Sequence, residues 1–198
     1  MADRSGLKQR GKLILILGGA RSGKSAFAQK LAQSQELPVT YVASGLPLDE
    51  EMRRRIAKHK ASRPVEWSTV EAPYSADQEV IPLCSEKKLV LWDCITVFLT
   101  NLLLESSGED TVPDQVEDLI LERFQSMLSR IEGCPGTLIA VSNEVGLGIV
   151  PEHPLGRGFR DLAGRVNQLL AQKADQVFFV LAGIPVEIKE GAFMGKQP

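Results

Sequence analysis

LILILGGARSGKS, residues 13–25, carries the strongest signal in the sequence. Its last eight residues, Gly18–Ser25, match the pattern GxxxxGK[ST] in full. The match follows the apolar run Leu13–Leu17 and precedes a segment of helical periodicity, which is the strand–loop–helix context that a phosphate loop requires. A chance match in a chain of this size has a probability of roughly 1% or less. We therefore predict a nucleotide-binding phosphate loop.

The chemistry of such a loop explains each residue type. Glycines let the backbone curl so that successive N–H groups point at one phosphate, and the following helix adds its positive N-terminal end. We expect Lys24 to reach the β and γ phosphates as a catalytic residue, and the Ser25 hydroxyl to bind Mg²⁺. The alternative is a glycine-rich turn with an exposed lysine. The predicted nucleotide-binding residues of this segment are Gly18, Gly19, Ala20, Arg21, Ser22, Gly23, Lys24 and Ser25.

A phosphate loop predicts an acidic residue at the end of another buried strand, where it supports the magnesium shell. The segment KLVLWD, residues 88–93, ends on Asp93 and fits this expectation. The alternative role for Asp93 is to cap a helix predicted over Ile95–Leu104, and the two roles are compatible. We predict Mg²⁺ as a cofactor, with Ser25 and Asp93 as its site residues.

Short apolar runs alternate with helical segments along the rest of the chain. The predicted strands are Leu13–Leu17, Val39–Ala43, Leu89–Trp92, Leu138–Val141 and Val177–Leu181. The predicted helices are Lys24–Ser34, Asp49–Lys60, Ile95–Leu104, Pro113–Ile131 and Arg160–Lys173. Runs that are apolar at nearly every position suit strands covered on both faces. This alternation predicts an α/β fold of the P-loop NTPase type, a single domain with a largely parallel sheet and helices on both faces.

Length and composition support one folded domain. The chain has 198 residues, of which 43% are hydrophobic and 24% charged, so a disordered or low-complexity chain is excluded. We predict a domain over residues 12–190, a flexible N-terminal extension over residues 1–11 and a C-terminal tail over residues 191–198. The net charge of −2 gives no general basic field, so we expect no nucleic-acid partner.

The apolar run Leu13–Leu17 is also the best candidate for a targeting segment. Five residues are too few for a signal peptide, which needs roughly 7–15 apolar residues, or for a membrane span, which needs about 20. Cys84, Cys94 and Cys134 lack CxxC spacing and cannot all pair, which favours buried thiols in a reducing compartment. We expect a cytoplasmic protein without a membrane span.

A second candidate site lies in DEEMRRRIAKHKASR, residues 49–63, which is dense in charge. Helical spacing puts His59 on or beside the apolar side, so it is either a core histidine or a functional one. Nearby cations suit a bound triphosphate and favour neutral imidazole, the form able to attack phosphorus. We take Arg53–Arg55 as a solvated helix face. The cations beside His59 are Lys58, Lys60 and Arg63.

Two later clusters leave their roles open. The loop SNEVGLGIVP, residues 142–151, follows a predicted strand at the sheet edge where α/β proteins bind ligands, but it could equally be an ordinary long connection. Arg160, Gly164 and Asn167 share one face of the next helix. That face either binds an acidic group or is merely solvated, and the sequence does not distinguish these alternatives.

Five segments together resemble the bifunctional family of adenosylcobinamide kinase/adenosylcobinamide-phosphate guanylyltransferases, which act in cobalamin biosynthesis. The phosphate loop is common to very many families, whereas the later segments in this order are specific. The resemblance covers about residues 12–190. The segments are GGARSGKS, RIAKHKxxRP, LWDCIT followed by TNLL, SNEVGxGIVP and FRDLAGRVNQ.

The resemblance implies two reactions that use ATP and GTP as substrates. A nucleoside triphosphate phosphorylates the hydroxyl of adenosylcobinamide, and GTP then gives its GMP to a histidine, from which the corrinoid phosphate takes it as adenosylcobinamide-GDP. His59 matches that histidine; the other histidine, His153, lies in a proline-flanked loop. Some relatives have a second histidine where this chain has Lys58. The resemblance also implies a homo-oligomer, with a trimer as one candidate.

The family's nucleotide contacts extend beyond the phosphate loop. They carry over, by resemblance, to a group after the second predicted strand, to the segment that follows His59, and to two acids. These residues are Ala43, Ser44, Gly45, Lys60, Ala61, Ser62, Arg63, Glu71 and Asp93.

Three other functions are alternatives to this one. The first alternative is a P-loop kinase of another small hydroxyl substrate, in which His59 is structural. A nucleic-acid-dependent ATPase is disfavoured by the pI near 5.8 and by the lack of an aromatic–basic stripe. A non-catalytic nucleotide-binding regulator is disfavoured by the magnesium-ready pair Ser25 and Asp93.

Overall fold

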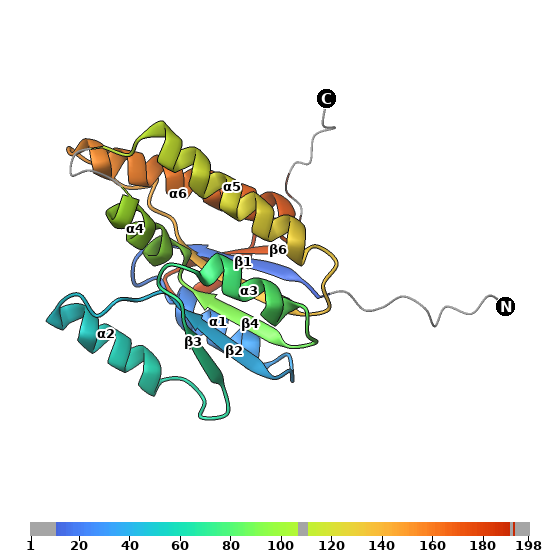
Figure 1. Ribbon diagram of the computed structural model, residues 1–198. Helices are drawn as coiled ribbons and strands as arrows, with labels where there is room; N and C mark the ends of the chain where they lie inside the picture. The colour runs from blue at the N-terminus through green and yellow to red at the C-terminus, as the bar shows by residue number, and fades with distance from the viewer. Residues whose placement is uncertain (1–10, 107–110, 191, 193–198) are drawn as a thin grey trace.

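The computed structural model describes residues 11–106, 111–190 and 192, and its centre is a seven-stranded sheet (Figure 1). The strand order is β3-β2-β4-β5-β1-β6-β7, in which β1 to β6 are parallel and β7 is antiparallel. The strands are β1 (Leu13–Gly18), β2 (Val39–Ala43), β3 (Ser68–Glu71), β4 (Leu89–Asp93), β5 (Thr137–Asn143), β6 (Gln176–Leu181) and β7 (Ile184–Glu187).

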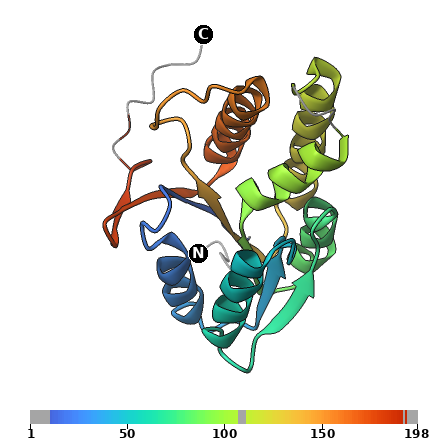
Figure 2. The same cartoon turned by 90° about the vertical axis from the view of Figure 1, so that its left-hand side faces the viewer.

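Within the described residues, six helices surround the sheet. They are α1 (Lys24–Gln33), α2 (Glu50–Ala61), α3 (Ala76–Cys84), α4 (Ile95–Ser106), α5 (Asp114–Ile131) and α6 (Pro154–Lys173). One face of the sheet packs against α3 to α6, and the opposite face packs against α1 (Figure 2). The predicted single-domain P-loop α/β fold, with a largely parallel sheet and helices on both faces, is confirmed.

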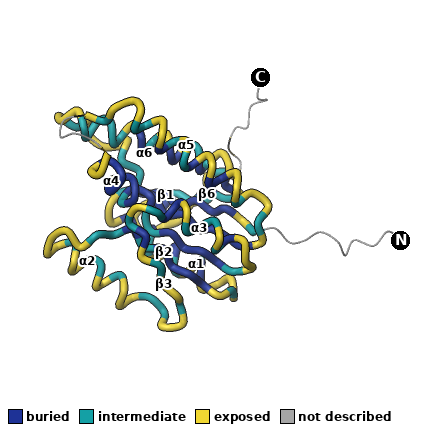
Figure 3. The backbone as a smooth tube through the Cα atoms, in the orientation of Figure 1, coloured by how far each residue is buried: buried dark blue, intermediate teal, exposed yellow. Residues whose placement is uncertain are grey.

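Strand β1 shows why the apolar runs lack alternation. Successive side chains of a strand point to opposite faces, so Leu13, Leu15 and Leu17 join the core beneath α3 to α6. Ile14 and Ile16 join the core beneath α1. Both faces are covered, so β1 is buried along its whole length and β2, β4 and β5 are buried up to their last residue. By contrast, α2 is exposed or half-buried throughout (Figure 3).

Three elements of the structure are not among those predicted from the sequence. β3 is an exposed edge strand with the polar sequence STVE, α3 contains Pro82, and β7 is a short exposed strand, so none shows a clear apolar period. The prediction that the last helix begins at Arg160 is wrong, because α6 begins at Pro154. Gly156 and Gly158 in this segment disfavour the prediction of a helix.

Those two glycines have a packing role instead. A Cβ at Gly156 would lie 2.9 Å from Pro151, and one at Gly158 would lie 2.7 Å from Val112, so the chain approaches the helix too closely for side chains. The first turns of α6 therefore depend on glycine for packing, despite its poor helix propensity.

The expected terminal segments fall almost entirely outside the described residues. At the domain boundary, the Gly11 N–H donates a hydrogen bond to the Cys134 carbonyl at 2.8 Å. All three cysteines are free thiols, with Cys84 buried and Cys94 and Cys134 half-buried. In the described part of the chain no helix combines the length and apolarity needed to cross a membrane.

Parallel pairing brings the carboxyl ends of six strands to one edge of the sheet. Gly18 pairs in register with Asn143, and Ala43 pairs with both Asp93 and Glu71. In open α/β sheets this edge is where ligands bind. The phosphate loop and the two predicted acids therefore belong to one region.

Candidate active site

The phosphate loop connects the end of β1 to the start of α1. Arg21 has φ 57° and Gly23, the N-cap of α1, has φ 97°, so the loop uses the left-handed region at two positions. The β6–β7 hairpin supports it from the side: the Gly183 N–H donates to the Ser22 carbonyl at 2.8 Å. A Cβ on Gly23 would lie 3.1 Å from the Gly183 Cα. Glycine is thus required at Gly23 both for its φ and for this close approach.

Lys24 folds back over this loop. Its Nζ donates to the Gly19 carbonyl at 3.1 Å, and the residue is only 8% exposed. Burial lowers the pKa of the Lys24 ammonium below its usual range, as does Arg55 more weakly, while Cys94 and Asp93 oppose that shift. Asp93 therefore acts electrostatically on the lysine. The alternative of an exposed lysine on a simple turn is wrong.

Asp93, at the end of β4, accepts a hydrogen bond from a buried tyrosine. The Tyr41 hydroxyl donates to Asp93 Oδ2 at 3.1 Å. Among the described residues, no backbone N–H of α4 donates to this carboxylate, so Asp93 does not act as the cap of that helix. Burial, followed by the neighbouring Asp93, raises the pKa of Tyr41 well above its ordinary value, which keeps the phenol a donor.

Arg63 covers the face of the same tyrosine. Its guanidinium carbon lies 3.5 Å from the centre of the Tyr41 ring, within the range of a cation–π contact. Its Nη1 also donates to Thr69 Oγ1 on β3 at 3.4 Å. The segment after His59 is therefore joined through Tyr41 to the carboxylate beside the phosphate loop.

Hydrogen bonds from buried side chains hold the residues at the end of β2 in place. Ser44 is fully buried, its hydroxyl accepts a hydrogen bond from Trp92 Nε1 at 2.8 Å, and its carbonyl accepts one from Asn101 Nδ2 at 2.8 Å. Ala43 and Gly45 are half-buried on either side. A Cβ at Gly45 would lie 3.4 Å from Ile56, so α2 passes over the end of β2.

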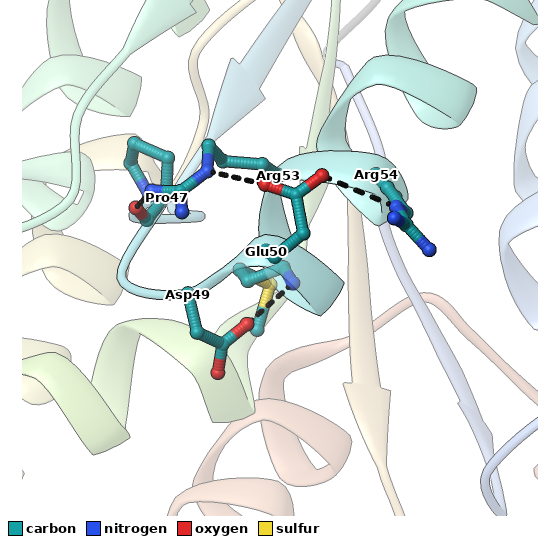
Figure 4. Close-up of polar contacts among 6 residues, drawn as sticks. Pro47, Asp49, Glu50, Arg53 and Arg54 are labelled. Carbon is teal, nitrogen blue, oxygen red and sulfur yellow. Dashed lines mark hydrogen bonds and ion pairs between the residues drawn. The ribbon is translucent and has the colours of Figure 1, made fainter.

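Helix α2 begins with a side-chain cap and a set of surface ion pairs (Figure 4). Asp49 accepts a hydrogen bond from the Met52 N–H at 2.7 Å, and Glu50 pairs with both Arg53 and Arg54. Arg55 pairs with Glu51 in the same way. The arginines form the solvated helix face that the sequence predicts.

His59 lies in the last turn of α2 and is half-buried. No residue of α2 is buried, so the core-histidine alternative is wrong. Within the described residues, no hydrogen bond or ion pair joins its side chain to the phosphate loop. The next residue, Lys60, pairs with Glu71 at the end of β3 and lowers the pKa of that carboxyl, chiefly through their hydrogen bond. Ala61 and Ser62 are exposed, and Ser62 Oγ donates to the His59 carbonyl.

Sequence reasoning missed a polar network at the end of β5, the strand between β1 and β4. Asn143 Nδ2 donates to Thr96 Oγ1 at 2.7 Å, and Thr96 in turn contacts Cys94 Sγ at 3.3 Å, next to Asp93. The Glu144 N–H donates to the Gly18 carbonyl at 3.0 Å. These contacts join the end of β5 both to Gly18 of the phosphate loop and to the residues that directly follow Asp93, and only the strand order reveals this.

Most of the polar side chains that the sequence analysis notes on α6 have hydrogen-bond or ion-pair partners within the chain. Asn167 is buried and its Nδ2 donates to the Asn143 carbonyl at 3.2 Å, so it belongs to the network of β5. Arg160 pairs with Asp161, and Arg165 pairs with Glu117. His153 is the exposed N-cap residue of α6.

Most of the chain is similar to proteins of one known family. The family described as "Cobinamide kinase / cobinamide phosphate guanyltransferase" matches residues 14–188. The bifunctional adenosylcobalamin biosynthesis protein CobU of Escherichia coli K12 is 43% identical over 182 residues, which cover 89% of this chain and 99% of the relative. CobU of Salmonella typhimurium LT2 gives the same figures, and CobP of Pseudomonas aeruginosa PAO1 is 42% identical over 175 residues, with 88% and 96% covered.

Proposed function

Because the chain belongs to the family of cobinamide kinases and cobinamide phosphate guanyltransferases, which are bifunctional enzymes, we propose that it makes adenosylcobinamide-GDP in two steps. It phosphorylates the hydroxyl of adenosylcobinamide with ATP or GTP, and then transfers GMP from GTP through a histidine. One observation carries this proposal: Arg63, in the segment after His59, covers Tyr41, whose hydroxyl donates to Asp93, and Asp93 lies within electrostatic range of Lys24 in the phosphate loop.

In the first step, the substrate hydroxyl attacks the γ phosphorus. The bond from that phosphorus to the β–γ bridging oxygen breaks, the nucleoside diphosphate leaves, and the hydroxyl proton is released. Backbone N–H groups of Gly18–Ser25 would hold the phosphates, and the Lys24 ammonium would stabilise charge on the γ phosphate. The buried position of Lys24 strengthens that interaction, because screening by water is weak there.

The residues present fit a magnesium ion. Ser25 supplies a hydroxyl at the start of α1, and Asp93 a carboxylate within electrostatic range of Lys24, and both are hard oxygen ligands. Among the described residues there is no cluster of three or more His, Cys, Asp or Glu side chains fit to hold a metal. That agrees with Mg²⁺, which is usually bound by one or two protein groups plus substrate phosphates. When bound, it would neutralise charge on the β and γ phosphates.

In the second step, an imidazole nitrogen of His59 attacks the α phosphorus of GTP. A P–N bond forms, the bond to the α–β bridging oxygen breaks, and pyrophosphate leaves. A phosphate oxygen of the corrinoid phosphate then attacks the same phosphorus and releases His59. Its half-exposed position leaves His59 accessible to the nucleotide, and Lys60 and Arg63 supply positive charge nearby.

A labelling experiment with GTP tests the covalent step. Incubation with α-labelled GTP and Mg²⁺ should label the protein on a denaturing gel, whereas γ-labelled GTP should not. A P–N bond is labile in acid and stable in base, so mild acid should remove the label. A plain kinase of another hydroxyl substrate would form no adduct.

Two histidine variants locate the label. His59→Ala should abolish the adduct yet still phosphorylate adenosylcobinamide, because that step uses the phosphate loop and not the nucleophile. His153→Ala is the matched control and should label normally, since His153 lies at the exposed start of α6. An acid-labile GMP adduct on the His59→Ala protein would make the assignment wrong.

A homo-oligomer, with a trimer as one candidate, and a cytoplasmic location are part of the same proposal. Exposed apolar side chains along the β6–β7 hairpin, Leu181, Ile184 and Val186, support self-association. Sedimentation equilibrium of the full chain measures the oligomeric state directly.

A further inference from the structure

We propose that Tyr41 is a positioning residue, which holds the Asp93 carboxylate in place for magnesium and links it to Arg63. The inference rests on the proposed function, because it requires Asp93 to serve the metal. In this role Tyr41 would contact neither substrate nor metal. Its action would be on the orientation of the carboxylate at the end of β4.

Tyr41 is built to hold one orientation. Its side chain is 2% exposed, in the core beneath α1, and strand pairing places it opposite Leu91, two residues before Asp93. Its hydroxyl reaches forward to the edge of the sheet and donates to Asp93 Oδ2 at 3.1 Å. A buried tyrosine hydroxyl needs a partner, so this bond is unfavourable to break.

The bond decides which way the carboxylate faces. A carboxylate on a strand end can rotate about its χ2, because that torsion is broad. A hydrogen bond to Oδ2 restricts the rotation and would leave Oδ1 as the oxygen available to a cation or to one of its bound waters. Groups of this kind, which hold a metal-binding side chain in place, typically change metal affinity by roughly 10–100-fold when they are removed.

Arg63 completes the arrangement from the face of the Tyr41 ring. The guanidinium, 3.5 Å from the ring centre, makes the phenol a stronger donor, because a nearby positive charge favours the release of its proton. Arg63 lies four residues after His59 and is also bonded to Thr69 on β3. A displacement of the segment that carries His59 would therefore shift the Asp93 carboxylate, because the Tyr41 ring connects the two.

The test is Tyr41→Phe, which removes the hydroxyl and keeps the ring that Arg63 covers. Mn²⁺ replaces Mg²⁺ as the probe, and its binding to the full chain with GDP is measured by electron paramagnetic resonance. We expect Mn²⁺ affinity to fall roughly tenfold. The melting temperature should stay near that of the wild type, and saturating Mg²⁺ should restore kcat, which a merely structural defect would not allow.

Tyr74→Phe is the matched control, because it removes the hydroxyl of the other tyrosine, near the start of α3. It should bind Mn²⁺ like the wild type. Asp93→Asn should weaken Mn²⁺ binding at least as much as Tyr41→Phe. The double variant should be no weaker than Asp93→Asn alone, since a residue that acts only through Asp93 adds nothing once the carboxylate is gone.

The outcomes separate this inference from the proposed function. Normal Mn²⁺ affinity in Tyr41→Phe, together with weak binding in Asp93→Asn, would overturn the role of Tyr41 and leave the metal site standing. Fully additive losses in the double variant would overturn it as well. If Asp93→Asn binds Mn²⁺ normally, the magnesium role of Asp93 fails, and the inference fails with it.

Discussion

Lys24 is a buried ammonium whose hydrogen bond goes to a carbonyl of its own loop. Lys24→Ala should reduce phosphorylation and guanylylation by about 100-fold or more, because charge that develops on the phosphates loses its stabilising cation. Steady-state assays of both reactions measure this, and the melting temperature should show that the fold persists. Lys30→Ala, on the exposed face of the same helix, is the control and should retain both rates. Near-normal turnover in Lys24→Ala would contradict the role of this segment as a phosphate loop.

The lowered pKa of Lys24 leads to a prediction about pH. Only the protonated amine is a cation, so kcat/KM for phosphorylation should fall as pH rises through the lowered pKa, below the ordinary value of 10.5. Lys24→Arg keeps its charge in this range, and its remaining activity should persist to higher pH. Rate profiles of both proteins from neutral to alkaline pH are the measurement. An identical alkaline decline in both would assign it to another group.

At this scale, the predictable residues are those whose role follows from their immediate neighbours in the chain. Lys24 and Ser25 follow from the GxxxxGK[ST] pattern alone, and Asp93 from its place at a strand end. The hydrogen bond of Tyr41 to Asp93 was not predictable, since the two are 52 positions apart and meet through the register of β2 and β4. A buried apolar strand offers no signal for one hydroxyl.

Among the described helices, α2 depends least on packing in the hydrophobic core for its stability. It buries no residue, and its stability depends on the Asp49 cap and on the ion pairs of its arginines. Asp49→Ala should therefore destabilise α2 by about 1 kcal/mol and leave the global melting temperature unchanged. Hydrogen exchange should quicken in α2, and guanylylation should slow while phosphorylation is retained.

A control on another helix makes that prediction specific. Asp118→Ala removes an exposed carboxylate within α5 and should leave exchange in α2 and both activities as they are. If Asp49→Ala lowers the global melting temperature, then α2 contributes to the core, contrary to its burial. If exchange in α2 is unchanged, the cap does not stabilise the helix.

The elements also show where periodicity stops being informative. The segment that forms α5 carries a broad apolar stripe, and its prediction differs from the structure by one residue at the start. β3 and β7 lie at the two edges of the sheet, where solvent replaces a packing partner and the apolar requirement disappears. Elements that do not need to bury a face leave little trace of their structure in the sequence.

For the molecule as a whole, the aromatic group beneath the site determines how far a core defect spreads. Phe124 of α5 is fully buried and stacks on Trp92, with ring centres 5.9 Å apart, and Trp92 binds Ser44 at the sheet edge. Phe124→Ala should cost about 3–5 kcal/mol and lower the melting temperature by roughly 10 °C. Calorimetry measures the shift.

The control for that variant lies on the same helix. Leu119 is 56% exposed, so Leu119→Ala should change the melting temperature little. Below its own melting transition, Phe124→Ala should still bind nucleotide, because the phosphate loop rests on β1 and α1 rather than on α5. A wild-type melting temperature for Phe124→Ala would show that the aromatic group does not support the core.

The bond between Gly183 and Ser22 has a consequence for biosynthesis. Synthesis proceeds toward the C-terminus, yet the loop that begins at Gly18 receives its lateral support from Gly183, which follows Ser22 by 161 positions. β1 also cannot pair until its two neighbours, β5 and β6, have left the ribosome, long after β1 itself. A nascent chain therefore carries β1 and the phosphate loop unpartnered until β5 and β6 have been synthesised. Among the described elements, the phosphate loop is synthesised early and completed late.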